Sequence, residues 1–246
     1  MAKLGIIPAR YASTRFPGKP LIDIAGKSMI QRVYEQACSA ASLDKVVIAT
    51  DDERIITEIQ RFGGEYVLTR SDHQSGTDRC AEVAEKVPGF DVIINIQGDE
   101  PYIDPVQINL LSSCFADPEV KLATLIKKIH SADELFNSNI PKVVINSIGE
   151  AIYFSRHPIP FIRNREQEDW ASAHQFYKHI GIYGYTQDTL MEITQLPSSS
   201  LEHAESLEQL RWVENNYKIQ TKITDLETIA VDTPEDLEKI IRLKGN

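Results

Sequence analysis

Residues 6–20 read IIPARYASTRFPGKP, a short apolar run that ends at Pro8 and continues as a loop of small and basic residues. The loop carries three cations, Arg10, Arg15 and Lys19, and no acidic residue. Small residues let backbone N–H groups approach a phosphate closely, and cations neutralise its charge. The stretch therefore predicts a strand that ends in a binding loop for an anion such as a nucleoside triphosphate. A solvated basic loop after the first strand is the alternative.

The better-known nucleotide signatures are absent from this loop. A dinucleotide-binding fingerprint needs G-x-G-x-x-G after the first strand, and only Gly18 is present here. A P-loop needs G-x-x-x-x-G-K-[ST]; residues 26–28 match its end, but Leu21 stands where the first glycine is required. We therefore expect a triphosphate to be held by another geometry.

Outward from the loop, strand-like and helix-like runs alternate. In the first half we expect strands at 4–7, 46–50, 65–69 and 92–97, and helices at 28–41, 53–62, 76–87 and 105–115. The second half predicts strands at 122–129, 142–146, 151–154, 179–185 and 219–223, a long loop at 156–170, and helices at 201–215 and 233–243. Such alternation favours an α/β fold with a mostly parallel, Rossmann-like sheet, helices on both faces and a smaller α+β lobe.

Composition excludes several classes of protein. The 246 residues include 36 acidic and 26 basic ones, for a net charge of −10, which argues against a nucleic-acid-binding surface. No apolar run approaches the roughly 20 residues of a membrane span, so we expect no membrane insertion. The three cysteines, Cys38, Cys80 and Cys114, are far apart and form no C-x-x-C pair. We expect small buried thiols and a cytoplasmic protein.

A second constellation, NIQGDEP at 95–101, places Asp99 just after the predicted buried strand. Ligands of open α/β sheets bind beyond the carboxyl ends of strands, where the basic loop also lies. A carboxylate beside a triphosphate suits Mg²⁺, which shares oxygen ligands with phosphates. Asp232, just before the predicted helix cap Thr233, is a second candidate ligand. The alternatives are an ordinary Gly-Asp turn for Asp99 and a helix-dipole role for Asp232.

Taken together, the motifs resemble the 3-deoxy-manno-octulosonate (Kdo) cytidylyltransferases over nearly the whole chain. The resemblance rests on eight segments in matching order: IIPARYASTRFPGKP (6–20), ATDDERI (49–55), DHQSGTDR (72–79), NIQGDEP (95–101), YFSR (153–156), HIGIYGY (179–185), LEHAESLEQLR (201–211) and VDTPEDL (231–237). The first segment is shared with other nucleotidyltransferases, whereas HQSGT, HIGIYGY and SLEQLR narrow the resemblance to the Kdo branch.

The resemblance implies a nucleotidyltransferase sheet and a Mg²⁺-dependent reaction. The anomeric hydroxyl of Kdo attacks the α-phosphorus of CTP, pyrophosphate leaves, and CMP-Kdo forms for lipopolysaccharide biosynthesis. By resemblance, Asp99 and Asp232 hold the metal, and Arg10 and Lys19 act with them as the catalytic residues. The residues implied to contact the nucleotide are Pro8, Ala9, Arg10, Ser13, Arg15, Lys19, His73, Ser75, Gly76, Arg79 and Gln97. Ser75 has an alternative role as a helix N-cap, with Asp78 three residues on.

For the sugar acid, the resemblance points to residues late in the chain. The implied contacts are Gln97, Arg156, His179, Tyr183, Glu208 and Gln209. Period-two spacing puts His179, Tyr183 and Tyr185 on one strand face, where a polyhydroxy acid finds several polar partners. Without the motif, these rings are ordinary residues at the edge of a core. The resemblance also implies a homodimer, and one domain: 1–120 with 219–246 binds CTP, and 121–218 binds the sugar acid and dimerises.

Two other interpretations remain open. A cytidylyltransferase for 8-amino-Kdo or a sialic-type acid would use the same phosphate and metal groups. A non-catalytic nucleotide-binding module on the same fold is the alternative from another class. The joint presence of Arg10, Lys19, Asp99 and Asp232 argues against it.

Overall fold

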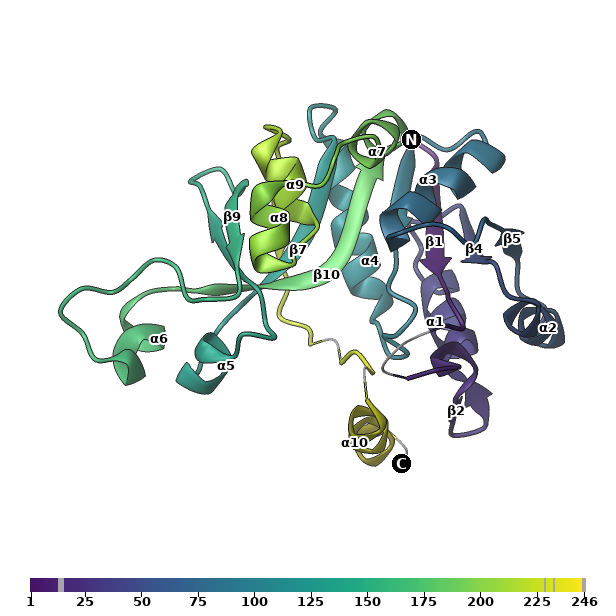
Figure 1. Cartoon of the computed structure of the whole chain (residues 1–246), viewed down its shortest axis with the longest axis horizontal. Helices are drawn as coiled ribbons and strands as arrows, with labels where there is room; N and C mark the ends of the chain where they lie inside the picture. The colour runs from purple at the N-terminus through teal and green to yellow at the C-terminus, as the bar shows by residue number, and fades with distance from the viewer. Residues whose placement is uncertain (13–15, 228, 232, 245–246) are drawn as a thin grey trace.

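The computed structural model describes residues 1–12, 16–227, 229–231 and 233–244. Its centre is a sheet whose main path runs β11-β7-β10-β6-β1-β4-β5 (Figure 1). These strands are β1 (Lys3–Pro8), β4 (Lys45–Thr50), β5 (Tyr66–Leu68), β6 (Val92–Asn95), β7 (Leu122–Lys128), β10 (Tyr177–Thr186) and β11 (Gln220–Ile223). Along this path β10 runs antiparallel to both neighbours and every other pair is parallel. The expected mostly parallel α/β sheet is confirmed.

Successive strand residues enter two cores, one on each face of the sheet. Ile7 and Ile48 pack on one face, and Ile6 and Val47 pack on the other. The helices on the first face are α1 (Met29–Cys38), α2 (Glu53–Phe62) and α4 (Pro105–Ser112). Those on the second are α3 (Gly76–Lys86), α7 (Gln187–Thr194) and α9 (Gln209–Glu214). Burial on both faces explains the near-continuous apolar runs of β1 and β6.

The ends of several helices follow directly from local sequence. At the start of α3, Ser75 Oγ accepts from the Asp78 amide at 3.1 Å, and an Asp78 oxygen accepts from the Ser75 amide at 2.9 Å. Thr233 and Asp236 make the same reciprocal pair before α10 (Pro234–Lys244), at 3.3 and 3.0 Å. Each pair satisfies backbone donors that a helix leaves unpaired. The predicted caps at Ser75 and Thr233 are confirmed.

The second half of the chain adds a lobe at one side of the sheet (Figure 1). It contains β8 (Lys142–Ile145), β9 (Ala151–Ser155), α5 (Ala132–Phe136), a 3₁₀ turn (Gln167–Asp169) and α6 (Trp170–Ala173). The first residues of β10 pair with β8, while later residues pair with β6. One long strand therefore belongs to both the central sheet and the lobe.

The short elements near the first loop are 3₁₀ turn η1 (Lys19–Leu21) and the hairpin β2 (Asp23–Ile24) and β3 (Lys27–Ser28). A further 3₁₀ turn, η2 (Ser113–Ala116), follows α4. Within the described residues, no helix is both long and apolar enough to cross a membrane.

The prediction of one helix over 201–215 was wrong. The segment forms α8 (Ser200–Glu205) and α9, separated by Ser206, which takes a left-handed conformation with φ 51° and ψ 49°. The Arg156 guanidinium donates to the Glu205 and Ser206 carbonyls at 2.6 and 3.2 Å. These hydrogen bonds satisfy carbonyls that the end of a helix leaves unpaired, and no glycine marks the break in the sequence.

The prediction of three buried thiols was wrong at one position. Cys80 and Cys114 are buried, but Cys38 lies exposed at the end of α1, and all three thiols are free. Burial raises the pKa of the Cys80 thiol well above its ordinary value. Cys38 lies one residue beyond Ala37, the last buried residue of the helix.

Candidate active site

The loops after β1 and β6 meet at the carboxyl ends of two adjacent parallel strands. Ile6 of β1 lies opposite Asn95 of β6 in the strand register. A Cβ atom on Gly98 would lie 2.7 Å from the Pro8 carbonyl oxygen, so only glycine permits this approach. A Cβ on Gly76 would lie 3.6 Å from the Pro8 ring. Three segments distant in sequence thus meet at Pro8.

Lys19 and Asp99 form the contact that joins the basic loop to the predicted metal ligand. Lys19 Nζ lies 2.8 Å from Asp99 Oδ2, and both side chains are largely buried, at 15% and 27% exposed. Lys19 begins η1 directly after Gly18, which takes a left-handed conformation with a φ of 74°. This contact brings the two constellations together, and a shared crevice stays a prediction.

Arg10 lies at the N-terminus of α3. Its Nη2 donates to the Ser75 carbonyl at 3.1 Å. Burial and the neighbouring Arg79 lower the pKa of Arg10 from its ordinary value, which still leaves the guanidinium charged at neutral pH. A guanidinium beside unpaired helix N–H groups is an arrangement that favours a bound anion.

Arg79 lies behind this surface rather than on it. Its side chain is fully buried, its Nη1 lies 2.8 Å from Asp51 Oδ1, and it also donates to Thr69. His73 is buried as well and contacts Glu82 through Nε2. Although burial opposes ionisation, hydrogen bonds from Lys86 and His73 hold the pKa of Glu82 at about 2. The side chains of Arg79 and His73 thus have structural partners, and nucleotide contact by either stays a prediction.

Of the remaining residues predicted to bind the nucleotide or the metal, some are described by the structure and some are not. Ala9 is buried, and its amide donates to the Ala49 carbonyl at 2.9 Å. Ser13, Arg15 and Asp232 lie outside the described residues. Among the residues that are described, no group of three or more His, Cys, Asp or Glu side chains is arranged to hold a metal.

The chemistry of Asp99 nevertheless suits a protein ligand of Mg²⁺. Its carboxylate is a hard oxygen donor at a strand end, and such metals complete their shells with phosphate oxygens and water. Its backbone carbonyl accepts from the Val231 amide at 2.9 Å. This hydrogen bond brings the 231–237 motif to the end of β6.

The predicted sugar-acid residues on β10 share one face. The His179 and Tyr183 rings lie 5.0 Å apart between centroids, and Tyr183 stacks on Tyr185 at 6.0 Å. Trp212 of α9 meets both tyrosines edge-on. His179 Nε2 lies 2.9 Å from Thr124 Oγ1, and burial lowers the pKa of His179 to about 3, so the ring is neutral. The shared face is confirmed.

Glu208 and Gln209 lie at the start of α9, next to this face. Glu208 Oε2 accepts from Thr77 Oγ1 of α3 at 2.7 Å, and Gln209 is buried. Burial raises the pKa of the Glu208 carboxyl above its ordinary value. Gln97, just after β6, donates through Nε2 to the Gly181 carbonyl at 2.8 Å. Hydrogen bonds thus connect the sugar-side residues to α3 and to β6.

Arg156 has structural partners for each nitrogen of its guanidinium. Besides the Glu205 and Ser206 carbonyls, it donates through Nη1 to the Ser138 carbonyl at 3.1 Å. The structure therefore places Arg156 at the C-terminal end of α8, and the predicted contact with a sugar carboxylate stays a prediction.

Comparison with known proteins decides the family. The family described as cytidylyltransferase matches residues 4–223. The 3-deoxy-manno-octulosonate cytidylyltransferase of Parabacteroides distasonis is 57% identical, covering 100% of this chain and 99% of its own. That of Bacteroides thetaiotaomicron is 58% identical, covering 97% and 96%. The chain belongs to the 3-deoxy-manno-octulosonate cytidylyltransferase family.

A solved structure agrees with this assignment. The structure of a CMP:2-keto-3-deoxy-manno-octonic acid synthetase complexed with CTP has a TM-score of 0.93 and 46% identity, and the alignment covers 100% of this chain and 99% of that one. This cytidylyltransferase is therefore a nucleotidyltransferase enzyme in both sequence and fold.

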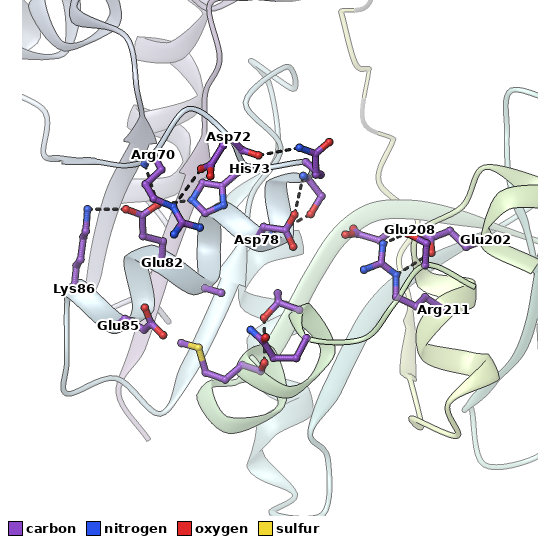
Figure 2. A pocket seen from close by; sticks show the side chains of 17 residues that line it. Arg70, Asp72, His73, Asp78, Glu82, Glu85, Lys86, Glu202, Glu208 and Arg211 are labelled. Carbon is purple, nitrogen blue, oxygen red and sulfur yellow. Dashed lines mark hydrogen bonds and ion pairs between the residues drawn. The ribbon is translucent and has the colours of Figure 1, made fainter. Parts of the chain in front are cut away.

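The cytidylyltransferase has a cavity of about 950 Å³ between α3, α7 and the α8–α9 segment. Figure 2 shows Asp78 on one wall and Glu208 with Arg211 on the other. His73 and Ser75 also line it, so the cavity joins residues from the nucleotide and sugar-acid predictions. Lys19 and Asp99, at the strand ends, do not line it.

Some residues of this cytidylyltransferase site were missed from sequence. Thr77 and Thr124 contact Glu208 and His179, and Trp212 packs on the tyrosines. Thr77 lies inside the DHQSGTDR motif, so its position carried a signal. Thr124 lies in an ordinary apolar run and Trp212 directly follows Arg211, and only the fold reveals their contacts.

Proposed function

We propose that this chain transfers the cytidylyl group of CTP to Kdo and releases pyrophosphate, as the names of its relatives indicate. The observation that carries the proposal is the 2.8 Å contact between Lys19 and Asp99 at the carboxyl ends of β1 and β6. The contact supports the proposal because a cation suited to phosphate and a carboxylate suited to a metal lie together at the edge where open α/β sheets bind ligands.

In this proposal the triphosphate lies between the basic loop and the N-terminus of α3. Lys19 neutralises phosphate charge, and Arg10 reaches the same region while donating to the Ser75 carbonyl. Such groups act by positioning and charge stabilisation, because phosphoryl-type transfer requires little covalent help from the protein. Ser13 and Arg15 belong to this loop and are proposed to assist.

Asp99 and Asp232 are the proposed ligands of Mg²⁺. The hydrogen bond from the Val231 amide to the Asp99 carbonyl supports this pairing. Bound there, the metal would stabilise negative charge on the phosphates and lower the pKa of the attacking hydroxyl. Lys19 would hold the Asp99 carboxylate in place and offset its charge when the metal is absent.

Kdo is proposed to lie against the β10 face, near Glu208. His179, neutral because of its low pKa, is suited to hydrogen bonding with hydroxyl groups rather than to binding a carboxylate as a cation. Gln97 links this face to the end of β6 through its hydrogen bond to the Gly181 carbonyl. In this proposal the hydrogen bond helps to set the spacing between the sugar and phosphate subsites. Gln209 lies beside Glu208 for the same task.

We also propose a cytoplasmic homodimer. The lobe exposes Ile152 at 53% and Phe161 at 74%, apolar side chains that a second copy of the chain would cover. The three free thiols suit a reducing compartment. Light scattering coupled to size exclusion tests the assembly: a dimer mass that falls to a monomer for Phe161→Glu supports this surface, and a wild-type monomer contradicts it.

Pyrophosphate release tests the reaction. Purified enzyme with Mg²⁺ and CTP is assayed with Kdo, 8-amino-Kdo and a sialic acid in parallel, and ATP, GTP and UTP replace CTP as controls. We expect release that requires both CTP and Kdo and is lost when EDTA removes the metal. Release with another acid in preference to Kdo would reassign the substrate. Silence with every acid, despite CTP binding, would leave a nucleotide-binding module.

A further inference from the structure

Lys142 is a buried lysine that the proposed reaction does not use. It lies on β8, opposite Ser155 of β9, and is 1% exposed. Its Nζ donates to the carbonyls of Asn137 and Ile140 at 2.9 and 2.7 Å, and no carboxylate of the described residues forms an ion pair with it. Burial and the positive charge of Arg156 lower the pKa of Lys142 to about 8, against a smaller opposing effect of Glu205.

A neighbouring buried lysine has its charge balanced by carboxylates, as is usual for a buried ammonium. Lys178, which pairs with Lys142 in the strand register, is 6% exposed and contacts the carboxylates of both Glu134 and Glu227. A buried ammonium without such a partner opposes folding, and an apolar side chain of similar length would fill the same space. Packing alone therefore does not account for a lysine at position 142, and its two hydrogen bonds to the loop are the feature to explain.

Lys142 binds the loop of residues 137–141. Two further carbonyls of this loop accept hydrogen bonds from residues of the predicted sugar-acid site. The Ser138 carbonyl accepts from Arg156 Nη1 at 3.1 Å. The Pro141 carbonyl accepts from the His179 backbone amide at 2.9 Å. Four carbonyls of one short loop thus contact Lys142, Arg156 and His179, and Lys142 contributes two of these hydrogen bonds.

From this loop the contacts continue to Glu208. Arg156 donates to the Glu205 and Ser206 carbonyls, where α8 ends and the chain turns left-handed. Two residues later Glu208 begins α9 and accepts from Thr77. The position of the loop therefore influences both His179 on β10 and Glu208 at the start of α9.

We propose that Lys142 is a positioning residue of the sugar-acid site. Its ammonium fixes loop 137–141, and the loop in turn fixes His179 through Pro141 and, through Ser138 and Arg156, the turn that presents Glu208. This role rests on the proposed function, because it assigns Lys142 to the binding of the sugar acid and leaves CTP binding to the strand ends.

Steady-state kinetics of Lys142→Met test the role. Methionine has similar length and no donor, so the loop loses both hydrogen bonds. We expect the KM for Kdo to rise about tenfold while the KM for CTP stays within about twofold. Lys142→Gln keeps a donor on a shorter chain, and we expect it to recover part of the loss, with a rise of about threefold.

Lys178→Met is the matched control. It removes the buried ammonium directly opposite Lys142 on the neighbouring strand and leaves both hydrogen bonds of Lys142 to loop 137–141 in place. We expect a lower melting temperature with the KM for Kdo within about twofold of wild type. An equal rise in the KM for Kdo in this control, or equal rises for both substrates in Lys142→Met, would show a general loss of structure and overturn the role.

Wild-type turnover with CTP and Kdo is measured first, because its absence overturns the proposed function and this role together. Normal wild-type turnover with an unchanged KM for Kdo in folded Lys142→Met overturns the positioning role only. If Lys142→Met does not fold, Lys142→Gln decides, and a KM for Kdo within about 1.5-fold of wild type counts against the role.

Discussion

Asp99 carries more contacts than a turn residue requires. Its carboxylate contacts Lys19 at 2.8 Å, and its carbonyl accepts from Val231. In the proposed metal site, a carboxylate held this way would need little reorganisation when substrate arrives. The same contacts allow the chemical role of Asp99 to be separated from a structural one by a substitution that keeps the shape.

For Asp99→Asn we expect turnover to fall by about a hundredfold or more, because the amide keeps the shape and loses the charge that would bind a metal. CTP binding, followed by calorimetry, should be partly kept. Asp104→Asn is the control: Asp104 caps α4, and asparagine caps a helix equally well. Near-normal turnover of Asp99→Asn would remove Asp99 from the metal site.

At Glu208 we expect a substitution that raises the melting temperature to weaken binding of the sugar acid. Burial raises its pKa, so the protonated carboxyl favours folding, and the stability that it contributes is lost as pH rises through the raised value. Glu208→Gln removes the charge and can still accept from Thr77. We expect its melting temperature to exceed that of wild type by a few degrees at pH 8 and by less near pH 4.5, while the KM for Kdo rises. If the difference in melting temperature between Glu208→Gln and wild type were larger near pH 4.5 than at pH 8, the buried charge would not be its cause.

What sequence could predict at the residue scale depended on how local the cause was. The cap at Ser75 and the stop of α2 at Gly63 follow from neighbouring residues, and both are observed. The burial of Lys142 was not predictable, since its partners are carbonyls arranged by the lobe. The motif containing Arg79 was found, yet motif membership does not distinguish a surface arginine from one buried against Asp51.

At the scale of elements, the break between α8 and α9 is the feature on which the sugar side depends. An apolar stripe at helical spacing runs through 201–210 and predicts one helix, because periodicity contains no information about a single left-handed residue. Ser206 takes that conformation without glycine, held by Arg156. The cause lies 50 positions away, just after β9, and is therefore invisible to any local pattern.

Ser206→Gly should stabilise the fold by about 1 kcal/mol, because glycine adopts the left-handed region without a steric cost. Ser206→Val should destabilise it and raise the KM for Kdo by displacing Glu208, with the KM for CTP little changed. Thermal unfolding and two-substrate kinetics measure both effects. Ser200→Ala, at the exposed first position of α8, is the control and should leave both values near wild type. If the KM for Kdo is unchanged in Ser206→Val, the break between α8 and α9 does not contribute to sugar binding.

The whole molecule is organised around β10, the one reversed strand of the main sheet path. β10 pairs with β6 and β7 in the centre and with β8 in the lobe. Because hydrogen bonds of a single strand connect the two parts, we expect one cooperative unfolding transition rather than separate melting of the lobe. Calorimetry checks this through the ratio of calorimetric to van't Hoff enthalpy, and a second transition assigned to the lobe would contradict it.

The path of the chain between β7 and β11 has a consequence for the diversification of such enzymes. These two strands are direct neighbours and run parallel, with Thr124 opposite Thr221, so the segment 129–219 leaves one strand at its carboxyl end and enters the neighbouring strand at its amino end. That segment carries His179, Tyr183 and Glu208, whereas Lys19 and Asp99 lie outside it. Recombination at two points on neighbouring strands could therefore exchange the acceptor specificity as a cassette and leave the nucleotide chemistry untouched.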